Sequence, residues 1–340
     1  MTKKELENKI NERLNSLTKP KESLGFLEDI ALKMGKIQGK VLPKLPEKKA
    51  VFVFAGDHGV TEEGVSAYPK EVTAQMVLNF LNGGAAINVF SRHVGSEVYV
   101  VDAGVDYDFP AHERLLNKKV GKGTKNFSKE PAMSREEAEK SIEYGKEIVR
   151  FAKEKGFELV AVGDMGIGNT TTATAIAVAL GHNLSELIDI GTAITGQQLE
   201  KKEAVVRQAI SIHEPFMDPI DVLSKVGSYC LGEMAGFILE CAQLNIPVVI
   251  DGFPTTAAAL IAAQLNPEVV DCMFAGHRSK VKGHRVLLDA LNLRPILDLD
   301  MRLGEGTGAV LSFSIIEAAI KMINEMATFD DANVSKGKEK

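Results

Sequence analysis

The stretch that decides the fold is LVAVGDMGIGNTTTATAIAVAL, residues 159–180. It begins with a short apolar run of strand type, passes through a glycine-rich turn at residues 163–168, and continues into a helix-like run of small and apolar residues. A strand that turns tightly into a helix is typical of a strand–helix–strand unit, in which the two strands are parallel.

Outward from this stretch, short apolar runs alternate with longer helical stretches. Runs of strand type occur at residues 50–55, 97–101, 159–162, 247–250, 269–274 and 295–299. Several of them are apolar on both faces, as expected for strands that helices cover from both sides. The alternation predicts an α/β fold of the Rossmann-like kind, a mostly parallel sheet with helices on both faces.

The two ends of the chain depart from this alternation. Residues 1–40 carry apolar residues at helical spacing among lysines and glutamates, with an interruption at residues 18–20. Residues 309–326 indicate a further helix, and residues 329–340 have the composition of a solvated tail.

Composition and charge exclude several classes of protein. The chain of 340 residues has a formal net charge of −6 with both signs mixed, which argues against a nucleic-acid partner. Three cysteines without a C-x-x-C pair argue against a disulfide framework or a zinc site and favour a reducing compartment. The N-terminus is charged throughout and no apolar run reaches about 18 residues, so we expect a cytoplasmic protein without a membrane span.

Polar residues follow the predicted strands. Acids lie at or beside the ends of five runs and a Gly-His turn follows the remaining one; these residues are Asp57, Asp102, Asp164, Asp251, Asp298 with Asp300, and His277. Ligands of open α/β sheets bind outside the carboxyl ends of the strands, so the repetition predicts a shared site at that edge. The alternative for any single loop is that Gly and Asp make an ordinary turn or helix N-cap.

The glycine-rich turn has the features of an anion site. Free N–H groups and the positive dipole end of the following helix attract phosphate. The spacing from Gly163 to Gly168 resembles a P-loop, but Asn169 stands where the lysine that reaches the β- and γ-phosphates is expected. This argues against ATP or GTP hydrolysis, hence against a kinase or phosphatase of the P-loop kind, and favours a monophosphate. The alternative is an ordinary capped helix. A second Gly/Thr-rich loop, residues 191–196, is followed by two lysines that could bind the same anion.

Several short motifs carry a resemblance to a known family. They are LTKP at 17–20, SLG at 23–25, GDHGV at 56–60, EVTAQMV at 71–77, GGAAIN at 83–88, GIGNTT at 166–171 and RLGEGTGA at 302–309. In number and order they resemble the nicotinate-nucleotide–dimethylbenzimidazole phosphoribosyltransferase (CobT) family over about residues 15–328.

The resemblance implies an activity and an architecture. The family transfers phosphoribose from nicotinate mononucleotide to an aromatic base such as 5,6-dimethylbenzimidazole, giving an α-riboside 5'-phosphate and nicotinate in the assembly of the cobamide (vitamin B12) nucleotide loop. No pyrophosphate leaves, so neither a cofactor nor a metal is expected. The implied domains are a small helical domain from residues 1–45 and 310–340 and an α/β phosphoribosyltransferase domain from residues 46–309. A homodimer is expected.

Site residues also follow from the resemblance. Glu305 would be the catalytic base; the alternative is that it caps the following helix. The nucleotide phosphate and ribose would lie against Asp164, Gly166, Gly168, Asn169, Thr170, Thr192 and Lys202. The base pocket would be lined by Ser66, Gln75 and Met76 and closed by Leu303 and Gly304.

Three departures from the family pattern concern the acceptor. Asp164 replaces the usual glutamate, and residues 226–236 and 275–284 differ from the usual sequences. Two alternatives therefore stay open. One is a phenol- or p-cresol-activating subunit that pairs with an unlike paralogue; the other is a non-catalytic nucleotide-binding partner. Within the third departure, His277 and His284 could suggest a metal pair, but satisfied loop histidines or phosphate contacts are the favoured interpretation.

Overall fold

The computed structural model describes residues 1–188 and 196–335, and its centre is one sheet of seven parallel strands. The strands are β1 (Lys49–Gly56), β2 (Glu97–Gly104), β3 (Leu115–Asn117), β4 (Leu159–Met165), β5 (Val248–Ile250), β6 (Met273–His277) and β7 (Pro295–Leu297). Their order, β3-β2-β1-β4-β5-β6-β7, reverses direction between β1 and β4. This is the Rossmann-like arrangement that the sequence predicts. In proteins with such a sheet, ligands bind where the strand order reverses.

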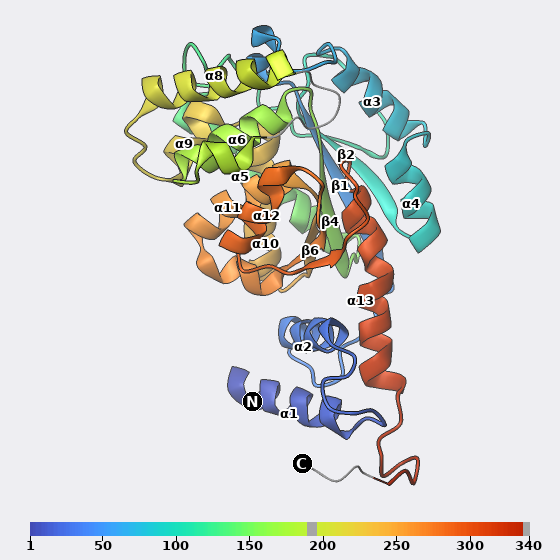
Figure 1. The fold of residues 1–340 in the computed structure, drawn as a ribbon. Coiled ribbons are helices and arrows are strands. Elements are labelled where there is room, and N and C mark those ends of the chain that lie inside the picture. Colours follow the sequence, from blue (N-terminus) through green and yellow to red (C-terminus); the bar gives the residue numbers. More distant parts are fainter. Residues whose placement is uncertain (189–195, 336–340) are drawn as a thin grey trace.

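Helices cover both faces of the sheet (Figure 1). One face carries α3 (Val72–Leu81), α4 (Ala86–Val94) and α13 (Thr307–Glu325). The other carries α5 (Arg135–Glu154), α6 (Asn169–Ala179), α7 (Leu184–Leu187), α8 (Gly196–His213), α9 (Pro219–Val226), α10 (Tyr229–Leu244), α11 (Phe253–Leu265) and α12 (Lys282–Ala290). A 3-10 helix, η1 (Gly59–Glu63), follows β1.

The alternation of side chains along β1 explains the two-sided core. All eight of its residues are buried, but successive side chains point to opposite faces. Phe52 and Phe54 join the core beneath α5 and α10, whereas Val51 and Val53 join the core beneath α4 and α13. A strand that is apolar at every position therefore requires helices on both sides.

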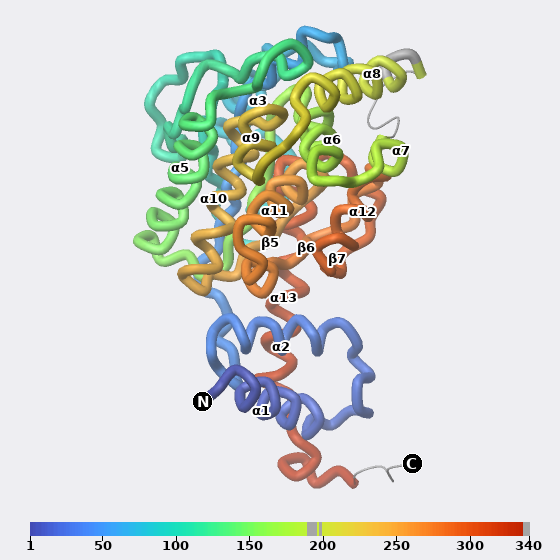
Figure 2. The backbone as a smooth tube through the Cα atoms, turned by 90° about the vertical axis from the view of Figure 1, so that its left-hand side faces the viewer, coloured from blue at the N-terminus to red at the C-terminus, as the bar shows by residue number. Residues whose placement is uncertain are grey.

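The chain ends meet in a helical part below the sheet (Figures 1 and 2). Here α1 (Lys3–Ser16) and α2 (Phe26–Gln38) pack near the end of α13. The Arg13 guanidinium donates to the carbonyls of Ile323 and Met326, and Leu17 forms a β-bridge with Thr328. The expected helices at both termini are confirmed. The division into two domains at residues 45 and 310 stays a prediction, because the core around α13 continues from the helical part to the sheet.

Two strand predictions need correction. The run 269–274 is not one strand: a 3-10 helix, η2 (Pro267–Cys272), occupies most of it, and β6 starts at Met273. The Asn266 side chain accepts a hydrogen bond from Glu268 N, and the ring of Pro267 fixes its own φ at a helical value. The chain therefore forms a helical turn before it extends into β6. The sequence also gives no signal for β3, a three-residue edge strand without an apolar run.

Among the described residues, one helix, α13, has the length and hydropathy of a membrane span. Its buried residues belong to the core shared by the sheet, α2 and α4, so we describe it as a core helix.

Candidate active site

A cavity of about 830 Å³ opens at the carboxyl edge of the sheet, beside the reversal between β1 and β4. Ten predicted site residues line it: Ser66, Met76, Asp164, Gly166, Gly168, Asn169, Thr170, Lys202, Leu303 and Glu305. Two others do not. Gln75 is exposed on α3, and Gly304 lies in the turn before Glu305. Thr192 lies outside the described residues.

The glycine-rich turn leads directly into α6 and gathers polar groups at its N-terminus. Gly168 is the N-cap with φ +94° and has no side chain to cap the helix. Asn169 donates to the Asp164 carboxylate over 2.6 Å, so the residue that replaces a P-loop lysine is paired with the acid of the same turn. From α8, the Lys202 ammonium donates to the Thr170 hydroxyl over 3.1 Å. A helix N-terminus with an ammonium beside it suits an anionic group.

His58 supports this turn from below. Its Nδ1 lies 2.9 Å from the Thr172 hydroxyl, and its Nε2 lies 3.7 Å from Cys230 Sγ. Burial lowers the pKa of His58 to about 4, so the ring is neutral near pH 7. A Cβ at Gly166 would lie 2.4 Å from the Gly56 carbonyl oxygen and 2.6 Å from the His58 ring. The turn can therefore sit on this histidine only with glycine at that position.

Glu305 reaches the cavity from a strained backbone. It has φ +63° between Gly304 at +88° and Gly306 at +90°, and its side chain is only 6 % exposed. Its Oε2 accepts a hydrogen bond from Ile87 N at the start of α4, over 3.3 Å. Burial raises the pKa of Glu305; the Ile87 N–H opposes this and the charge of Asp251 adds to it. A carboxylate that binds protons more tightly than usual suits a general base.

Asp164 is the second acid in the cavity. It is buried at the end of β4, and burial raises its pKa to about 6, although the hydrogen bond from Asn169 opposes the shift. Its Oδ1 has no hydrogen-bond partner among the side chains that the structure describes.

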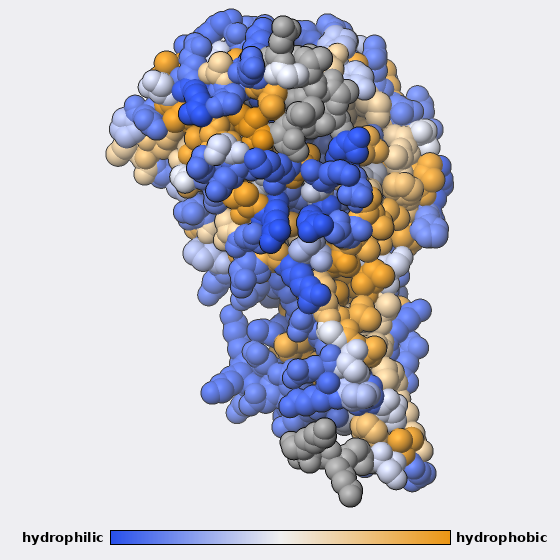
Figure 3. Space-filling model, viewed as in Figure 1, coloured by the Kyte–Doolittle hydropathy of each residue, from blue (hydrophilic) through white to orange (hydrophobic). Residues whose placement is uncertain are grey.

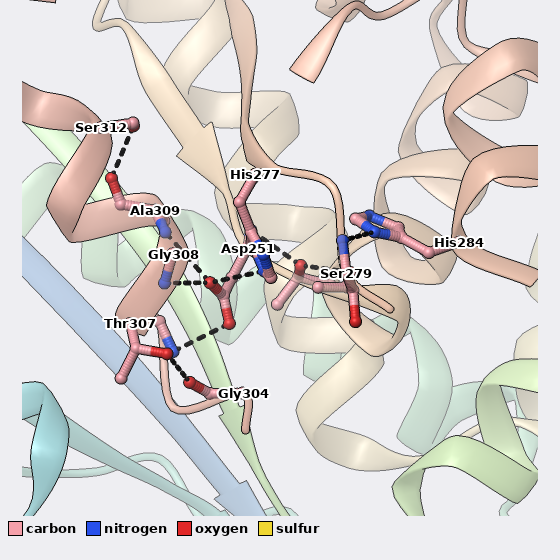
Figure 4. Close-up of polar contacts among 12 residues, drawn as sticks. Asp251, His277, Ser279, His284, Gly304, Thr307, Gly308, Ala309 and Ser312 are labelled. Atoms are coloured by element: carbon pink, nitrogen blue, oxygen red, sulfur yellow. Dashed lines mark hydrogen bonds and ion pairs between the residues drawn. The ribbon is translucent and has the colours of Figure 1, made fainter. Parts of the chain in front are cut away.

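Asp251, at the end of β5, caps α13 from a distance (Figure 4). It accepts hydrogen bonds from the backbone N–H groups of Gly306, Gly308 and Ala309, over 3.1, 2.8 and 3.0 Å. The N-cap residue is Gly306, which has no side chain, so the alternative role of Glu305 as the cap of this helix does not hold. His277 Nε2 lies 3.4 Å from Asp251 Oδ1.

The two histidines of the third departure differ. His284 accepts from Ser279 N over 2.8 Å and lies 2.9 Å from the Thr256 hydroxyl, which makes it a satisfied buried residue. Burial lowers its pKa to about 3. His277 is buried beside Asp251, and neither of its ring nitrogens has a hydrogen-bond partner among the described residues, so the interpretation as a satisfied histidine is wrong for it. Across the described ranges 1–188 and 196–335, no group of three or more His, Cys, Asp or Glu side chains could hold a metal ion.

Sequence reasoning missed some of the site. Asp251 and His58 were visible as strand-end residues, but their partners come from distant elements. Apart from Met76 and Leu303, the large apolar side chains of the lining were not predicted, among them Val65, Tyr68, Val72, Leu187, Phe253, Val281 and Leu299. These residues carry no local signal, because an apolar residue that faces a cavity resembles one that faces the core.

This chain is similar along almost its whole length to proteins of one family. A family model described as phosphoribosyltransferase matches residues 1–334. A nicotinate-nucleotide–dimethylbenzimidazole phosphoribosyltransferase of Geobacter sp. (strain M21) is 51 % identical over 325 residues, 95 % of this chain and 93 % of the relative. One of the same name from Chloroflexus aggregans is 52 % identical over 96 % of this chain and 93 % of the relative. The crystal structure of CobT from Thermus thermophilus matches with a TM-score of 0.95 at 48 % identity, covering 98 % of this chain and 100 % of that chain.

Proposed function

The chain belongs to the nicotinate-nucleotide–dimethylbenzimidazole phosphoribosyltransferase (CobT) family, and we propose that its cavity transfers phosphoribose from nicotinate mononucleotide to 5,6-dimethylbenzimidazole. It is a pentosyl-transferring glycosyltransferase of cobalamin biosynthesis. The observation that carries the proposal is the joint position of an anion-binding helix start and a carboxylate of raised pKa in one cavity.

The bond changes can be assigned to groups of the site. A ring nitrogen of the base attacks C1' of the ribose from the face opposite nicotinate, and the new C–N bond forms as the old one breaks. The electron pair of the broken bond goes to the pyridine nitrogen, which was cationic and leaves neutral. Glu305 takes the proton that the benzimidazole loses, and attack from the opposite face converts the β-linkage to an α-linkage.

Binding roles follow the geometry. The phosphate lies against residues 166–170 and Lys202, where the start of α6 and an ammonium favour an anion. The acceptor lies among Ser66, Met76 and Leu303. Holding both substrates in line supplies effective molarity, which requires neither a metal nor a cofactor.

The test is direct. Purified protein is incubated with nicotinate mononucleotide and 5,6-dimethylbenzimidazole, and the products are identified by mass. We expect free nicotinate and the α-riboside 5'-phosphate of the base in equal amounts. Absence of turnover with every benzimidazole and phenol offered, alone or with a paralogous chain, would overturn the proposal.

The same assay separates the alternatives. The names of the relatives favour a benzimidazole acceptor over a phenol. A phenol- or p-cresol-activating subunit would instead form an O-glycoside, which differs in mass from the benzimidazole product. A non-catalytic nucleotide-binding partner would bind nicotinate mononucleotide and release no nicotinate.

We further propose a cytoplasmic homodimer. Figure 3 shows hydrophobic residues gathered along the side of the molecule that carries α4 and α13. Val89 on α4 is 48 % exposed, and Phe90 on α4 and Leu311 and Ile315 on α13, which packs against α4, are half-buried. Contiguous apolar surface of this kind marks interfaces, and a two-fold axis would pair the patch with itself. Light scattering on purified protein gives the test: twice the chain mass of 36.8 kDa is expected, and a monomer at working concentration would contradict it.

A further inference from the structure

Asp251 uses both carboxylate oxygens on one turn of backbone. Oδ2 accepts from Gly306 N, and Oδ1 accepts from Gly308 N and Ala309 N. The side chain is 1 % exposed and is absent from the cavity lining. Asp251 therefore acts on the protein and not on a substrate.

The turn that Asp251 holds begins one residue after Glu305. Three successive residues, 304–306, have left-handed backbone, which is strained at Glu305 because this residue has a Cβ. Such a conformation persists only where the surroundings fix it. The hydrogen bonds to Asp251 supply that constraint on the helix side of Glu305. On the sheet side, Gly163 lies against the Glu305 backbone, because a Cβ there would come within 2.5 Å of it.

We propose that Asp251 is a positioning residue for phosphoribosyl transfer: it fixes the backbone of Glu305, and its negative charge acts on that base. The inference rests on the proposed function, since it takes Glu305 as the base. It adds a residue outside the cavity whose charge, and not only whose shape, serves the reaction.

Other ionisable groups near the pair come from β4, β6, α12, α8 and the loop before Glu305. Asp164 at the end of β4 adds negative charge, and His277 on β6 lies 3.4 Å from Asp251. His284 on α12 stacks obliquely on His277, with ring centroids 5.9 Å apart, and is neutral. Arg302 and Lys202 line the same cavity as Glu305. Asp251 raises the pKa of Glu305 and of Asp164, so removal of its charge lowers both.

The experiment replaces Asp251 by asparagine, which keeps the shape and one oxygen acceptor but removes the charge. Asp102→Asn is the matched control. Asp102 is also a buried strand-end acid, 2 % exposed, but it does not line the cavity, contrary to the expectation of one site shared by all the strand-end acids. It accepts a backbone hydrogen bond from Val105 N and pairs with Lys119. Glutamate labelled with ¹³C at the carboxyl carbon lets Glu305 be titrated by NMR without signals from Asp164. The resonance is assigned by its loss in Glu305→Gln.

In Asp251→Asn we expect Glu305 to titrate at lower pH than in the wild type, and kcat to fall about 10²-fold, the loss typical of a reacting group displaced by about 1 Å. The Asp102→Asn variant should keep both the wild-type titration of Glu305 and the wild-type kcat. If Asp251→Asn does not fold, Asp251→Ser removes the same charge and keeps a hydroxyl acceptor.

Two results would overturn the inference. One is an unchanged Glu305 titration, which would leave Asp251 a structural cap only. The other is a lowered titration with wild-type kcat, which would show that the charge does not serve the reaction. Failure of the proposed function is a separate result, because it would show as a wild-type enzyme without turnover.

Discussion

At the scale of single residues, the two most deeply buried glutamates have opposite surroundings. Glu305 faces the cavity and accepts a hydrogen bond from Ile87 N. Glu233, in the middle of α10, is fully buried, and neither of its carboxyl oxygens has a hydrogen-bond partner among the described residues. Burial raises the pKa of both acids, but only the first one lies where a substrate can reach it.

Replacing Glu305 by glutamine tests the first role. Glutamine keeps an oxygen for Ile87 N, so KM for nicotinate mononucleotide should change little, while kcat should fall about 10²–10⁴-fold with the loss of a general base. The base acts when ionised and its pKa is raised, so wild-type activity should decline as the pH falls toward that pKa, and this decline should be weaker in the variant. Steady-state kinetics across pH give the measurement. Wild-type kcat in the variant would exclude Glu305 as the base.

Replacing Glu233 by glutamine tests the cost of burying an acid. In the unfolded chain Glu233 ionises at pH ~4.3, whereas in the folded protein it stays protonated to higher pH. Its contribution to the free energy of unfolding is therefore present at low pH and is lost as the pH rises. We expect Glu233→Gln to raise the melting temperature at pH 8 and to match the wild type near pH 4. Glu240→Gln, on the same helix, should lower it instead, because Glu240 pairs with Arg150 over 2.9 Å. A variant of Glu233 that melts below the wild type at pH 8 would contradict the prediction.

Sequence patterns pointed to Glu305 and Lys202 because both lie in or beside motifs whose residues act together locally. They did not identify Asp251 as the cap of α13, since the two are joined by 55 or more residues of chain. A pattern along the chain contains the acid and the helix but not their contact. The family resemblance placed both Gln75 and Met76 in the base pocket, but only Met76 lines the cavity, because the motif does not show which face of α3 is turned toward it.

At the scale of elements, α8 carries Lys202 to the start of α6, and this arrangement predicts a binding effect. Lys202→Ala should raise KM for nicotinate mononucleotide with a smaller effect on kcat, because an ammonium that binds the phosphate would contact it equally before and during transfer. Lys201→Ala is the control, since Lys201 is exposed and lies beside Gly64. Equal kinetics for the two variants would remove Lys202 from the site.

The contact of β4 with the loop before α13 gives a further prediction. A Cβ at Gly163 would lie 2.5 Å from the C and O atoms of Glu305, which are backbone and cannot rotate away. Gly163→Ala should cost about 1–3 kcal/mol of stability, as overpacking does, and should lower kcat by shifting Glu305. Gly56→Ala, at the end of the neighbouring strand, meets Cys230 at an ordinary 3.5 Å and should cost less. Urea unfolding and kinetics test both, and equal costs would contradict the argument.

Element prediction succeeded where hydrophobic runs are long and failed where tertiary contacts decide. The bounds of β1 were predicted to within one residue at either end, because every position of this strand is buried. The strand β3 exists only as a partner along the edge of β2. At residues 269–274, Val269 is buried by the 3-10 turn and not by strand pairing, so the apolar run gave the burial correctly and the backbone wrongly.

At the scale of the whole molecule, Lys33 joins the helical part to the sheet. From α2 its ammonium donates to the carbonyls of Val270 and Met273, at the point where η2 gives way to β6, and it lies 5.1 Å from the centre of the Phe274 ring. Burial lowers the pKa of Lys33 from 10.5 to about 8. A half-buried cation therefore contributes to the join between the two parts, beside the core that they share.

Lys33→Met should reveal this join in the pH dependence of stability. Between pH 8 and pH 10.5 the unfolded chain binds a proton that the folded protein does not, so wild-type stability gains a contribution that rises with pH. The variant carries no titrating group at this position and should lose that rise. Lys36→Met, on the same helix with a half-exposed ion pair to Glu7, should keep it. Chemical denaturation of the wild type and both variants at several pH values gives the measurement, and a rise that persists in Lys33→Met would contradict the prediction.

The pairing of the two chain ends also sets the order of events during synthesis. The carbonyls of Ile323 and Met326, which accept hydrogen bonds from Arg13, are synthesised 310 and 313 residues after it. At roughly 5–20 residues per second this delay is about 15–60 s, during which α1 and α2 have each other as partners but not α13. The sheet, whose strands all lie between residues 49 and 297, can assemble in that interval. Helices α1 and α2 are thus made before the sheet, but they complete their packing only when α13 has followed it.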